Sequence, residues 1–383
     1  MPPERPKLIF LVTEDWYFCS HRLPMARAAR DSGFDVAVAT RVTAHGEAIR
    51  REGFVLHPLR WRRRAVGPLA TVAAVFEIWQ LYRREQPLIV HHVSLKPALL
   101  GGVAARLARV KLVVAMMTGL GYLGGTGRGA VRLLVGLARL ILPWALFGRR
   151  GRVIVQNDDD RKALAAMCPG KAARIVVIPG SGIDLAHFTP APEPPAPPVT
   201  VAYTGRMIAT KGIATLIEAQ QRARMRGIDL RLTLVGDSDE ENPSAIDRTT
   251  LAQWAALPGV TWLGRRDDVR PVWREAHIAA LASPSREGLP KSLLEAAAMA
   301  RPIVASDIPG VRVVARHRIN ALLVPPSDIA AWTEAFVALA SDAALRQRLG
   351  AAGRRIVEDG LSDQAIAAAT GALYRDLLRE IGR

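Results

Sequence analysis

Short runs of β-branched and aliphatic residues alternate with helical patterns along the whole chain, and this alternation constrains the fold most. Alternation at this spacing builds βαβ units with mostly parallel sheets. The sequence therefore predicts an α/β fold of two doubly wound parallel-sheet domains that face each other across a cleft. The predicted strands are 8–13, 35–40, 88–93, 111–117, 152–156 and 174–179, then 199–204, 231–236, 260–263, 278–282, 302–306 and 322–325.

A proline-rich segment separates the two sets of strands. Six of the ten residues 189–198 are proline, a composition that stays extended and semi-rigid. A chain of 383 residues also exceeds the size at which one hydrophobic core usually stops growing. We therefore expect an N-terminal domain at 1–188, a linker at 189–198, a C-terminal domain at 199–361 and an amphipathic helix at 362–383 that could return to the N-terminal domain.

Several other classes of protein are disfavoured by composition. Hydrophobic residues make up 50% of the chain, which excludes a disordered protein. Two cysteines, Cys19 and Cys168, are too few for a disulfide framework or a thiolate zinc site. The apolar run 8–12 is shorter than a signal-peptide core, and no stretch of about 18 uncharged apolar residues follows. We expect a cytoplasmic protein without a conventional membrane span.

The formal net charge of +17 comes almost entirely from the first half of the chain. Residues 60–152 hold sixteen Lys and Arg residues and only two acidic ones, Glu77 and Glu85. Such a basic face could follow a phosphate backbone, rest on anionic lipid, or be a solvated surface. Apolar segments accompany the charge at 66–81 and at 130–147, where Arg128, Arg132 and Arg139 fall on one side of a predicted helix. We therefore expect an anionic membrane surface as partner, and no nucleic acid.

A glycine-rich loop follows the predicted strand 111–117. Gly119, Gly121 and Gly124 match the GxGxxG spacing of dinucleotide sites, which also need an acidic residue about 20 positions later. Between Glu85 and Asp158 the chain has no acidic residue, which excludes a nicotinamide site. The loop still suits a phosphate or a sugar, because glycine lets backbone N–H groups approach a ligand closely.

Three features of the second half fall at the carboxyl ends of predicted strands. Gly205 and Arg206 follow the first strand, and Lys211 stands where a helix opens, so that two cations and a helix N-terminus could cradle a diphosphate. Gly264 and Arg265 follow another strand, where tight backbone could accept a nucleobase edge. Glu287 and Glu295 stand eight positions apart in a loop and the helix after it. Each feature alone is common, since acidic residues often only complement a helix dipole.

Together these motifs resemble glycosyltransferase family 4. The likeness rests on Arg206 with Lys211, on Glu287-Gly-Leu-Pro-Lys-Ser-Leu-Leu-Glu295, and on the segments 302–310 and 322–328. It implies the GT-B fold with two Rossmann-like domains, a nucleotide-sugar donor, retention of anomeric configuration and no metal or other cofactor. It also implies that Arg206 and Lys211 bind the donor diphosphate, Glu287 the donor sugar hydroxyls and Glu295 the ribose hydroxyls. We expect Arg206, Lys211 and Glu287 to be the catalytic residues, and Gly205, Gly288 and Leu289 to belong to the donor site as well.

A narrower likeness covers the first half. The segments 20–24, 91–97 and 118–122 resemble the branch that extends undecaprenyl-diphosphate-linked sugars. The acceptor-side candidates are then His21, His92, Lys96, Thr118 and Gly119. Among the histidines His21, His91 and His92 we prefer His92 as the site residue, and a hydrogen-bonded histidine that closes a βα turn stays an open alternative. The chain departs from the family at Thr118, where many members have histidine, at 312–315 and at 320–321.

The predicted function is retaining transfer of an N-acetylhexosamine or hexose from a UDP-sugar to a polyprenyl-diphosphate-linked saccharide. We expect it at the inner face of the cytoplasmic membrane, in assembly of bacterial surface glycans or glycoproteins. Two alternatives are also consistent with the sequence. Another nucleotide-sugar enzyme on the same fold, such as an epimerase, would keep the donor site, and a nucleic-acid-binding protein would explain the charge but not the acidic pair.

Overall fold

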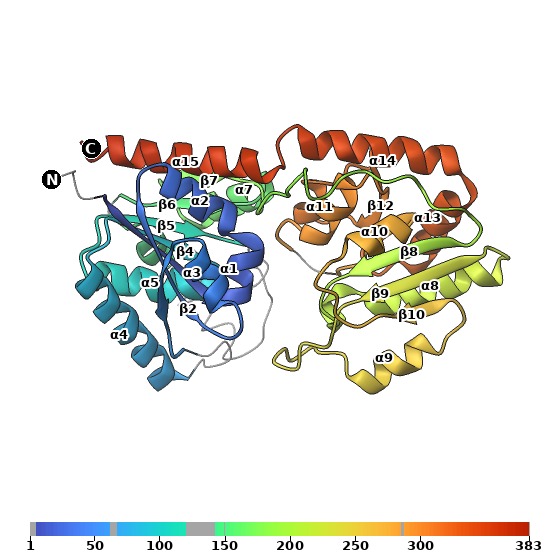
Figure 1. The fold of residues 1–383 in the computed structure, drawn as a ribbon, viewed down its shortest axis with the longest axis horizontal. Coiled ribbons are helices and arrows are strands. Elements are labelled where there is room, and N and C mark those ends of the chain that lie inside the picture. The colour runs from blue at the N-terminus through green and yellow to red at the C-terminus, as the bar shows by residue number, and fades with distance from the viewer. Residues whose placement is uncertain (1–4, 62–66, 120–141, 149, 285–286, 383) are drawn as a thin grey trace. The chain divides into compact units, whose positions relative to one another are not determined.

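The computed structural model describes residues 5–61, 67–119, 142–148, 150–284 and 287–382, and it divides into two units. The N-terminal unit comprises Met1–Ser181 together with Gln364–Arg383, and the C-terminal unit comprises Gly182–Asp363. Each unit is built around one parallel β-sheet with helices on its faces (Figure 1). The boundary at Ser181 places the proline-rich segment 189–198 inside the C-terminal unit.

The N-terminal unit contains a seven-stranded sheet in the order β3-β2-β1-β4-β5-β6-β7. All of its strand pairs are parallel, which requires a crossover connection between successive strands. The strands are β1 (Lys7–Glu14), β2 (Asp35–Arg41), β3 (Val55–Pro58), β4 (Ile89–Val93), β5 (Leu112–Met116), β6 (Arg152–Val155) and β7 (Ile175–Val177).

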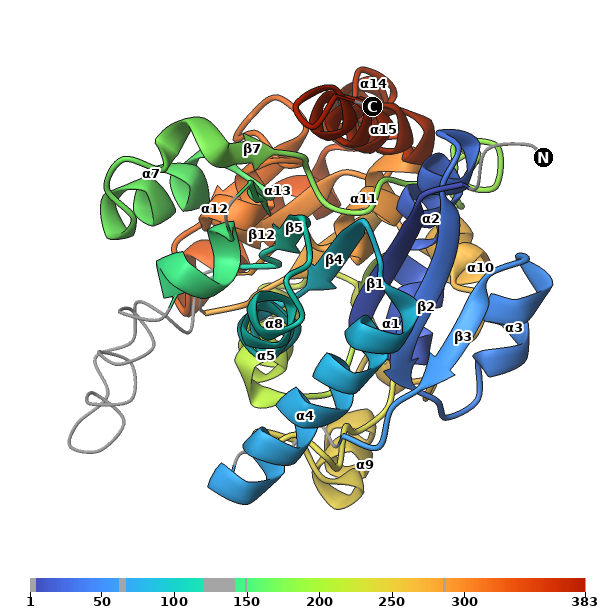
Figure 2. The same cartoon turned by 90° about the vertical axis from the view of Figure 1, so that its left-hand side faces the viewer.

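Helices cover both faces of this sheet because alternate strand residues point to opposite sides. Leu8 and Phe10 of β1 pack in a cluster with residues of α2, α3 and α15, whereas Ile9 and Leu11 pack in another with α4 and α5. Figure 2 shows α4 and α5 next to each other in the N-terminal unit. The helices are α1 (Asp15–His21), α2 (Leu23–Asp31), α3 (Gly46–Arg51), α4 (Pro68–Glu85), α5 (Leu95–Leu107), α7 (Asp158–Met167) and α15 (Asp363–Arg379), with a short 3₁₀ helix at Ala172–Arg174.

The C-terminal unit contains a six-stranded parallel sheet in the order β10-β9-β8-β11-β12-β13. Its single core cluster draws side chains from all six strands. The strands are β8 (Val199–Thr204), β9 (Leu230–Val235), β10 (Val260–Trp262), β11 (Ile278–Leu281), β12 (Ile303–Ser306) and β13 (Ala321–Val324). The helices are η3 (Ala209–Lys211, 3₁₀), α8 (Ile213–Met225), α9 (Arg248–Ala255), α10 (Arg270–Glu275), α11 (Lys291–Ala298), α12 (Pro309–Arg312), α13 (Ile329–Ser341) and α14 (Ala343–Glu358).

Both sheets reverse their strand order at one point. In the C-terminal unit the reversal lies between β8 and β11, which are neighbours in the sheet although far apart in the chain. In the N-terminal unit it lies between β1 and β4. Open α/β sheets bind ligands beyond the carboxyl ends of the strands at such a switch point. The topology therefore singles out the loops after these four strands.

The C-terminal helix α15 packs on the N-terminal sheet. Its Ile366, Tyr374 and Leu377 belong to the same core cluster as β1 and β2. The Tyr374 hydroxyl is 2.6 Å from Nδ1 of the buried His91 in β4, and the His91 ring stacks on Phe10 with centroids 4.8 Å apart. Burial lowers the pKa of His91 well below its ordinary value, so the histidine is neutral.

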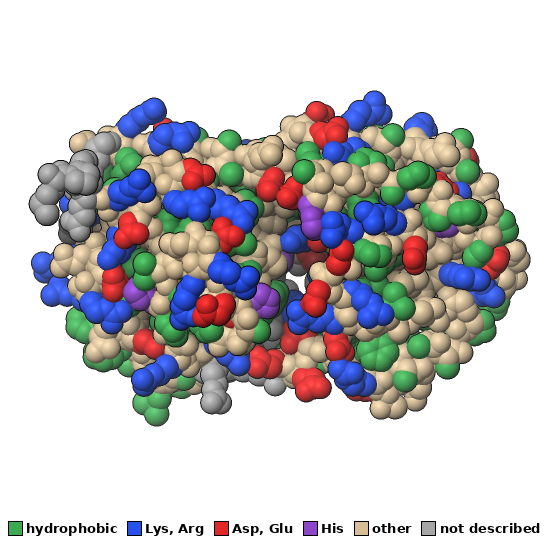
Figure 3. All heavy atoms as spheres, viewed as in Figure 1, with side chains coloured by type: hydrophobic (Ala, Val, Ile, Leu, Met, Phe, Trp, Pro, Cys, Tyr) green, Lys and Arg blue, Asp and Glu red, His purple; other side chains and the backbone are tan. Residues whose placement is uncertain are grey.

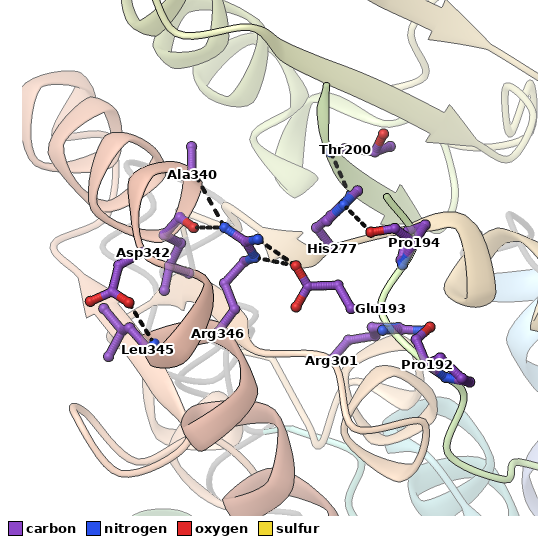
Figure 4. A network of polar contacts seen from close by, with 11 residues as sticks. Pro192, Glu193, Pro194, Thr200, His277, Arg301, Ala340, Asp342, Leu345 and Arg346 are labelled. Carbon is purple, nitrogen blue, oxygen red and sulfur yellow. Dashed lines mark hydrogen bonds and ion pairs between the residues drawn. The ribbon is translucent and has the colours of Figure 1, made fainter. Parts of the chain in front are cut away.

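The proline-rich segment is held to the C-terminal unit by a polar network (Figure 4). The Arg346 guanidinium donates to the Glu193 carboxylate at 2.7 Å, and Arg301 donates to the Pro192 carbonyl at 3.0 Å. His277 accepts from the Thr200 amide at 3.0 Å through Nδ1 and donates to the Pro194 carbonyl at 3.1 Å through Nε2. The segment predicted as a linker between domains is thus fixed to the C-terminal unit.

The predicted strands all appear, but β3 was not predicted. It is an edge strand of four residues, Val-Leu-His-Pro, whose end residues are exposed, so it carries little hydrophobic signal. Most of the predicted helix at 130–147 lies outside the described residues, as does Arg128, and the described part 142–147 is helical. In the described part of the chain, no helix combines the length and the apolarity needed to span a membrane.

Candidate active site

Three glycines bring the loops after β8, β9 and β10 into close contact. The Gly205 amide donates to the Val235 carbonyl and the Gly236 amide to the Gly264 carbonyl, each at 2.9 Å. A Cβ on Gly236 would lie 1.8 Å from the Gly205 carbonyl oxygen, so no larger residue fits there. The result is a tight surface of backbone at the carboxyl edge of the sheet, which a flat or anionic ligand can approach.

Lys211 and Glu287 meet at the switch point of the C-terminal sheet. The Lys211 Nζ lies 2.6 Å from a Glu287 carboxylate oxygen, and the two side chains are only 20% and 15% exposed. Ser283 also donates its hydroxyl to the other Glu287 oxygen. Gly212, which has a φ of +70°, sets the approach of the two loops, since a Cβ there would lie 1.9 Å from the Ala282 carbonyl. The sequence motifs after β8 and β11 therefore converge on one place.

Arg206 is the second cation beside β8. Its guanidinium donates to the Asp239 carboxylate at 2.7 Å, and its carbonyl accepts from the buried Tyr203 hydroxyl at 2.8 Å. The Arg206 side chain is 40% exposed, so it is oriented yet accessible. Arg206 and Lys211, each paired with one carboxylate, both follow β8 at the carboxyl edge, where α8 begins at Ile213. Such a site suits a diphosphate, because fixed donors and a helix dipole stabilise anions.

Glu295 lies within α11, eight positions after Glu287. Burial raises the pKa of its carboxyl to about 7, and Lys291 and the Trp273 indole act against that rise. A carboxyl that titrates near neutrality accepts hydrogen bonds from hydroxyl groups when ionised and donates one when protonated. This chemistry suits recognition of sugar or ribose hydroxyls.

The other predicted donor-side residues lie in three places. Arg265 is 69% exposed and pairs with Asp267 at 3.2 Å, beyond Gly264. Gly288 lies under α12, since a Cβ on Gly310 would be 2.2 Å from the Gly288 carbonyl oxygen. Leu289 packs, partly buried, against the core. The backbone of the loop after β11 is thus held between the core and α12.

In the N-terminal unit, three acceptor-side candidates follow β4 and β5. The Thr118 hydroxyl donates to the Ser94 hydroxyl at 3.3 Å, next to Gly119, which has a φ of +135°. Ser94 has a φ of +78°, a strained conformation for a residue with a side chain. Lys96, in the first turn of α5, holds its ammonium 5.9 Å from the Trp61 ring centroid. These residues line the carboxyl edge of the sheet.

The two histidine candidates have different surroundings. His21 ends α1 and is partly exposed, with its ring stacked on Tyr17 at a centroid distance of 4.4 Å. His92 is fully buried within β4, and its Nε2 lies 3.0 Å from the Tyr82 hydroxyl. Burial lowers the pKa of His92 to about 3. This placement agrees with a neutral core histidine and offers no exposed surface for an acceptor contact.

Three residues that shape the site were not predicted from the sequence. Asp239, which pairs with Arg206, lies 33 positions away in the loop after β9, and Ser283, which donates to Glu287, lies at the start of the loop after β11. Gly236 follows β9 directly, and its place as the last residue of the predicted strand 231–236 was the available signal for it. No comparable signal marks Asp239 among its acidic neighbours 237–241.

Two family models match the chain. The model described as "Glycosyl transferase 4-like" matches residues 7–150, and the one described as "Glycosyl transferases group 1" matches residues 198–342. The capsular polysaccharide biosynthesis glycosyltransferase CapM of Staphylococcus aureus is 22% identical over 98% of both chains. An Escherichia coli UDP-Gal:alpha-D-GlcNAc-diphosphoundecaprenol alpha-1,3-galactosyltransferase is 24% identical over 74% of each chain.

The fold is similar to that of solved glycosyltransferase-like proteins. The crystal structure of Anabaena HepE in complex with UDP-glucose superposes with a TM-score of 0.75 at 18% identity, covering 97% of this chain and 100% of that one. Together with the two parallel sheets, this likeness defines the GT-B fold. The chain belongs to the GT-B glycosyltransferases, and its activity is that of a glycosyltransferase.

Proposed function

We propose that the protein transfers an N-acetylhexosamine or hexose, with retention of configuration, from a UDP-sugar to a polyprenyl-diphosphate-linked saccharide. The transfer takes place at the inner face of the cytoplasmic membrane, during assembly of a bacterial surface glycan or glycoprotein. The observation that carries the donor half is the cationic site of Arg206 and Lys211 at the switch point, beside Glu287. Structural relatives solved with UDP and UDP-glucose support this donor class.

The chemical demand of the reaction is to stabilise the departing nucleoside diphosphate. The bond between sugar C1 and the phosphate oxygen breaks, C1 bonds to the acceptor oxygen, and the leaving phosphate oxygen takes the acceptor proton. Arg206 and Lys211 stabilise the charge that develops on the diphosphate, and their carboxylate partners hold them in place beforehand. In this proposal the protein's own cations supply the stabilisation, and no metal or other cofactor is required.

The remaining donor contacts follow from the same geometry. Glu287, held by Lys211 and Ser283, accepts from hydroxyls of the donor sugar. Glu295 accepts from the ribose hydroxyls, and the Gly264 backbone with Arg265 lies toward the nucleobase. On the acceptor side, Lys96, Thr118 and Gly119 stand at the carboxyl edge of the other sheet. His21 is the exposed histidine candidate, and His92 is left without an acceptor role.

The acceptor half rests on two kinds of support. The Escherichia coli relative acts, by its name, on a diphosphoundecaprenol-linked sugar. The N-terminal unit also carries exposed apolar side chains in the basic stretch 60–152, among them Leu69, Val72 and Trp144. Apolar side chains beside Lys and Arg are the composition of a peripheral membrane surface.

Release of UDP tests the proposal. The full chain is incubated with a panel of UDP-sugars, with and without a short-chain polyprenyl-diphosphate-linked saccharide, and UDP and the product are quantified. The proposal expects UDP release that depends on the acceptor, and an α-configured product from an α-linked donor. Turnover of a UDP-sugar without any acceptor, giving an epimer, would instead identify an epimerase. Binding of the protein to anionic rather than neutral vesicles tests the membrane partner.

A further inference from the structure

The N-terminal unit contains a groove whose lining residues all belong to that unit. It runs between α4 and the segment 57–61 and has a volume of about 730 Å³. One helical stripe of α4, with spacings of three and four residues, forms one wall, and Lys96 of α5 closes the groove at the carboxyl edge of the sheet. The α4 residues that line the groove are Ala70, Ala73, Ala74, Phe76, Glu77, Gln80, Leu81 and Arg84. We call this feature the α4 groove.

The lining of the α4 groove combines apolar and charged side chains. Leu59, Trp61, Ala70, Ala73 and Ala74 supply apolar surface. Arg60 and Lys96 supply positive charge: the Lys96 ammonium lies 5.9 Å from the Trp61 ring centroid, and the Arg60 backbone amide donates to the Glu77 carboxylate at 3.1 Å. A volume of this size is typical of sites for small organic ligands. The combination suits a ligand with an anionic head and a hydrocarbon tail.

The outer side of α4 continues the apolar surface of the groove. Leu69, Val72 and Phe76 are 87%, 67% and 53% exposed and recur at helical spacing. Figure 3 shows hydrophobic side chains at the lower left edge of the molecule, where α4 lies in Figure 1. Exposed apolar side chains grouped on one helix mark an interaction surface rather than a solvated one.

We propose that the α4 groove holds the first isoprene units of the lipid acceptor, with its diphosphate at Arg60 and Lys96. The chain then leaves past Leu69, Val72 and Phe76 toward the bilayer. This inference rests on the proposed function, because it assigns a place to the lipid of that acceptor. It also fits the reaction, since Lys96 stands at the carboxyl edge, beside the loops of Ser94 and Thr118.

The test titrates two ligands into the full-length protein by calorimetry. Farnesyl diphosphate is the probe, and inorganic pyrophosphate represents its headgroup without the hydrocarbon chain. Burial of the chain adds about 0.8 kcal/mol per methylene, so farnesyl diphosphate should bind at least tenfold more tightly than pyrophosphate. Ala73→Trp fills the groove from an exposed helix position and should weaken farnesyl diphosphate at least tenfold, without changing pyrophosphate affinity. Lys96→Ala should weaken both ligands.

Arg83→Trp is the matched control, because Arg83 is exposed on the same helix but neither lines the groove nor belongs to the exposed apolar surface of α4. It should bind farnesyl diphosphate like the wild type, and all three variants should bind the UDP-sugar like the wild type. Equal affinities for farnesyl diphosphate and pyrophosphate, or wild-type binding by Ala73→Trp, would overturn the proposal. The proposal would also be overturned if the wild type were a dimer that Ala73→Trp dissociates, because a second copy of the chain would then cover the groove.

Transfer kinetics separate this proposal from the proposed function. If the wild type transfers sugar to a farnesyl-diphosphate-linked saccharide, Ala73→Trp should raise the KM for that acceptor about tenfold and leave kcat unchanged. An unchanged KM would reject the groove and leave the function standing. The opposite outcome is also distinguishable. If Ala73→Trp abolishes binding of farnesyl diphosphate but the wild type transfers sugar to no polyprenyl acceptor, the proposed acceptor is rejected and the groove remains a lipid-binding site.

Discussion

Removal of the Lys211 ammonium is the most informative perturbation of the donor site. Its Nζ lies 2.6 Å from Glu287, it is 20% exposed, and its loop is fixed where Gly212 packs on Ala282. A charge held this firmly needs no reorganisation as the diphosphate departs. Loss of one such preorganised group typically lowers kcat by about 10² to 10³, which is about 3 to 4 kcal/mol of transition-state stabilisation.

The change to stability should be much smaller. The Lys211–Glu287 pair is neither fully buried nor exposed, so Lys211→Ala should cost about 1 to 2 kcal/mol, between the values typical of exposed and of buried pairs. The matched control is Arg222→Ala on α8, which breaks an ion pair with Glu218 whose members are 45% and 49% exposed. That variant should lose less than about 1 kcal/mol and keep wild-type kcat.

The assay is acceptor-dependent release of UDP at saturating UDP-sugar, with urea unfolding of the same samples. The expected pattern is a kcat for Lys211→Ala at least a hundredfold below that of Arg222→Ala, with both variants folded. A kcat for Lys211→Ala within threefold of the wild type would refute the assignment of Lys211 to the leaving group.

Three further predictions concern packing and protonation. Gly236→Ala should abolish UDP-sugar binding and lower the free energy of unfolding by about 3 kcal/mol, because its Cβ would lie 1.8 Å from the Gly205 carbonyl oxygen. Titration and urea unfolding measure the two effects. Gly227→Ala is the control, because Gly227 also has a positive φ but a Cβ there would meet nothing within 4 Å. UDP-glucose affinity should rise between pH 6 and pH 8 as Glu295, with a pKa of about 7, ionises, and Glu295→Gln should abolish that dependence. His92 has a pKa of about 3 in the folded protein and of about 6.5 in the unfolded chain, so below pH 6.5 protonation favours the unfolded chain. The free energy of unfolding that depends on His92 should therefore fall by about 2 kcal/mol from pH 7 to pH 5. If the unfolding free energy of a His92→Gln variant fell by the same amount as that of the wild type, this prediction would be wrong.

Much of the fold follows from local sequence. Buried parallel strands such as β5 and β11 are continuous apolar runs between helical patterns, so they can be located from the chain alone. The edge strand β3 lacks that signal because its four residues are not fully covered. The proline-rich segment was expected to join two domains, but its attachment depends on Arg301 and Arg346, which come from distant parts of the chain.

The candidate site could also be predicted only in part. Lys211 and Glu287 could be expected near each other because their strands end at one edge of one sheet, and the structure places them in contact. Asp239 could not, because an acidic loop residue gives no indication of which arginine it will meet. His92 was expected to reach an acceptor from the end of the predicted strand 88–93, but β4 is a central strand covered on both faces, which buries every one of its side chains.

A crystal structure of the protein grown with a UDP-sugar tests the central claim most directly. The account predicts the diphosphate against Arg206 and Lys211 at the carboxyl ends of β8 and β11, with the ribose at Glu295. A nucleotide bound anywhere else, with the Lys211–Glu287 pair untouched by phosphate, would contradict it.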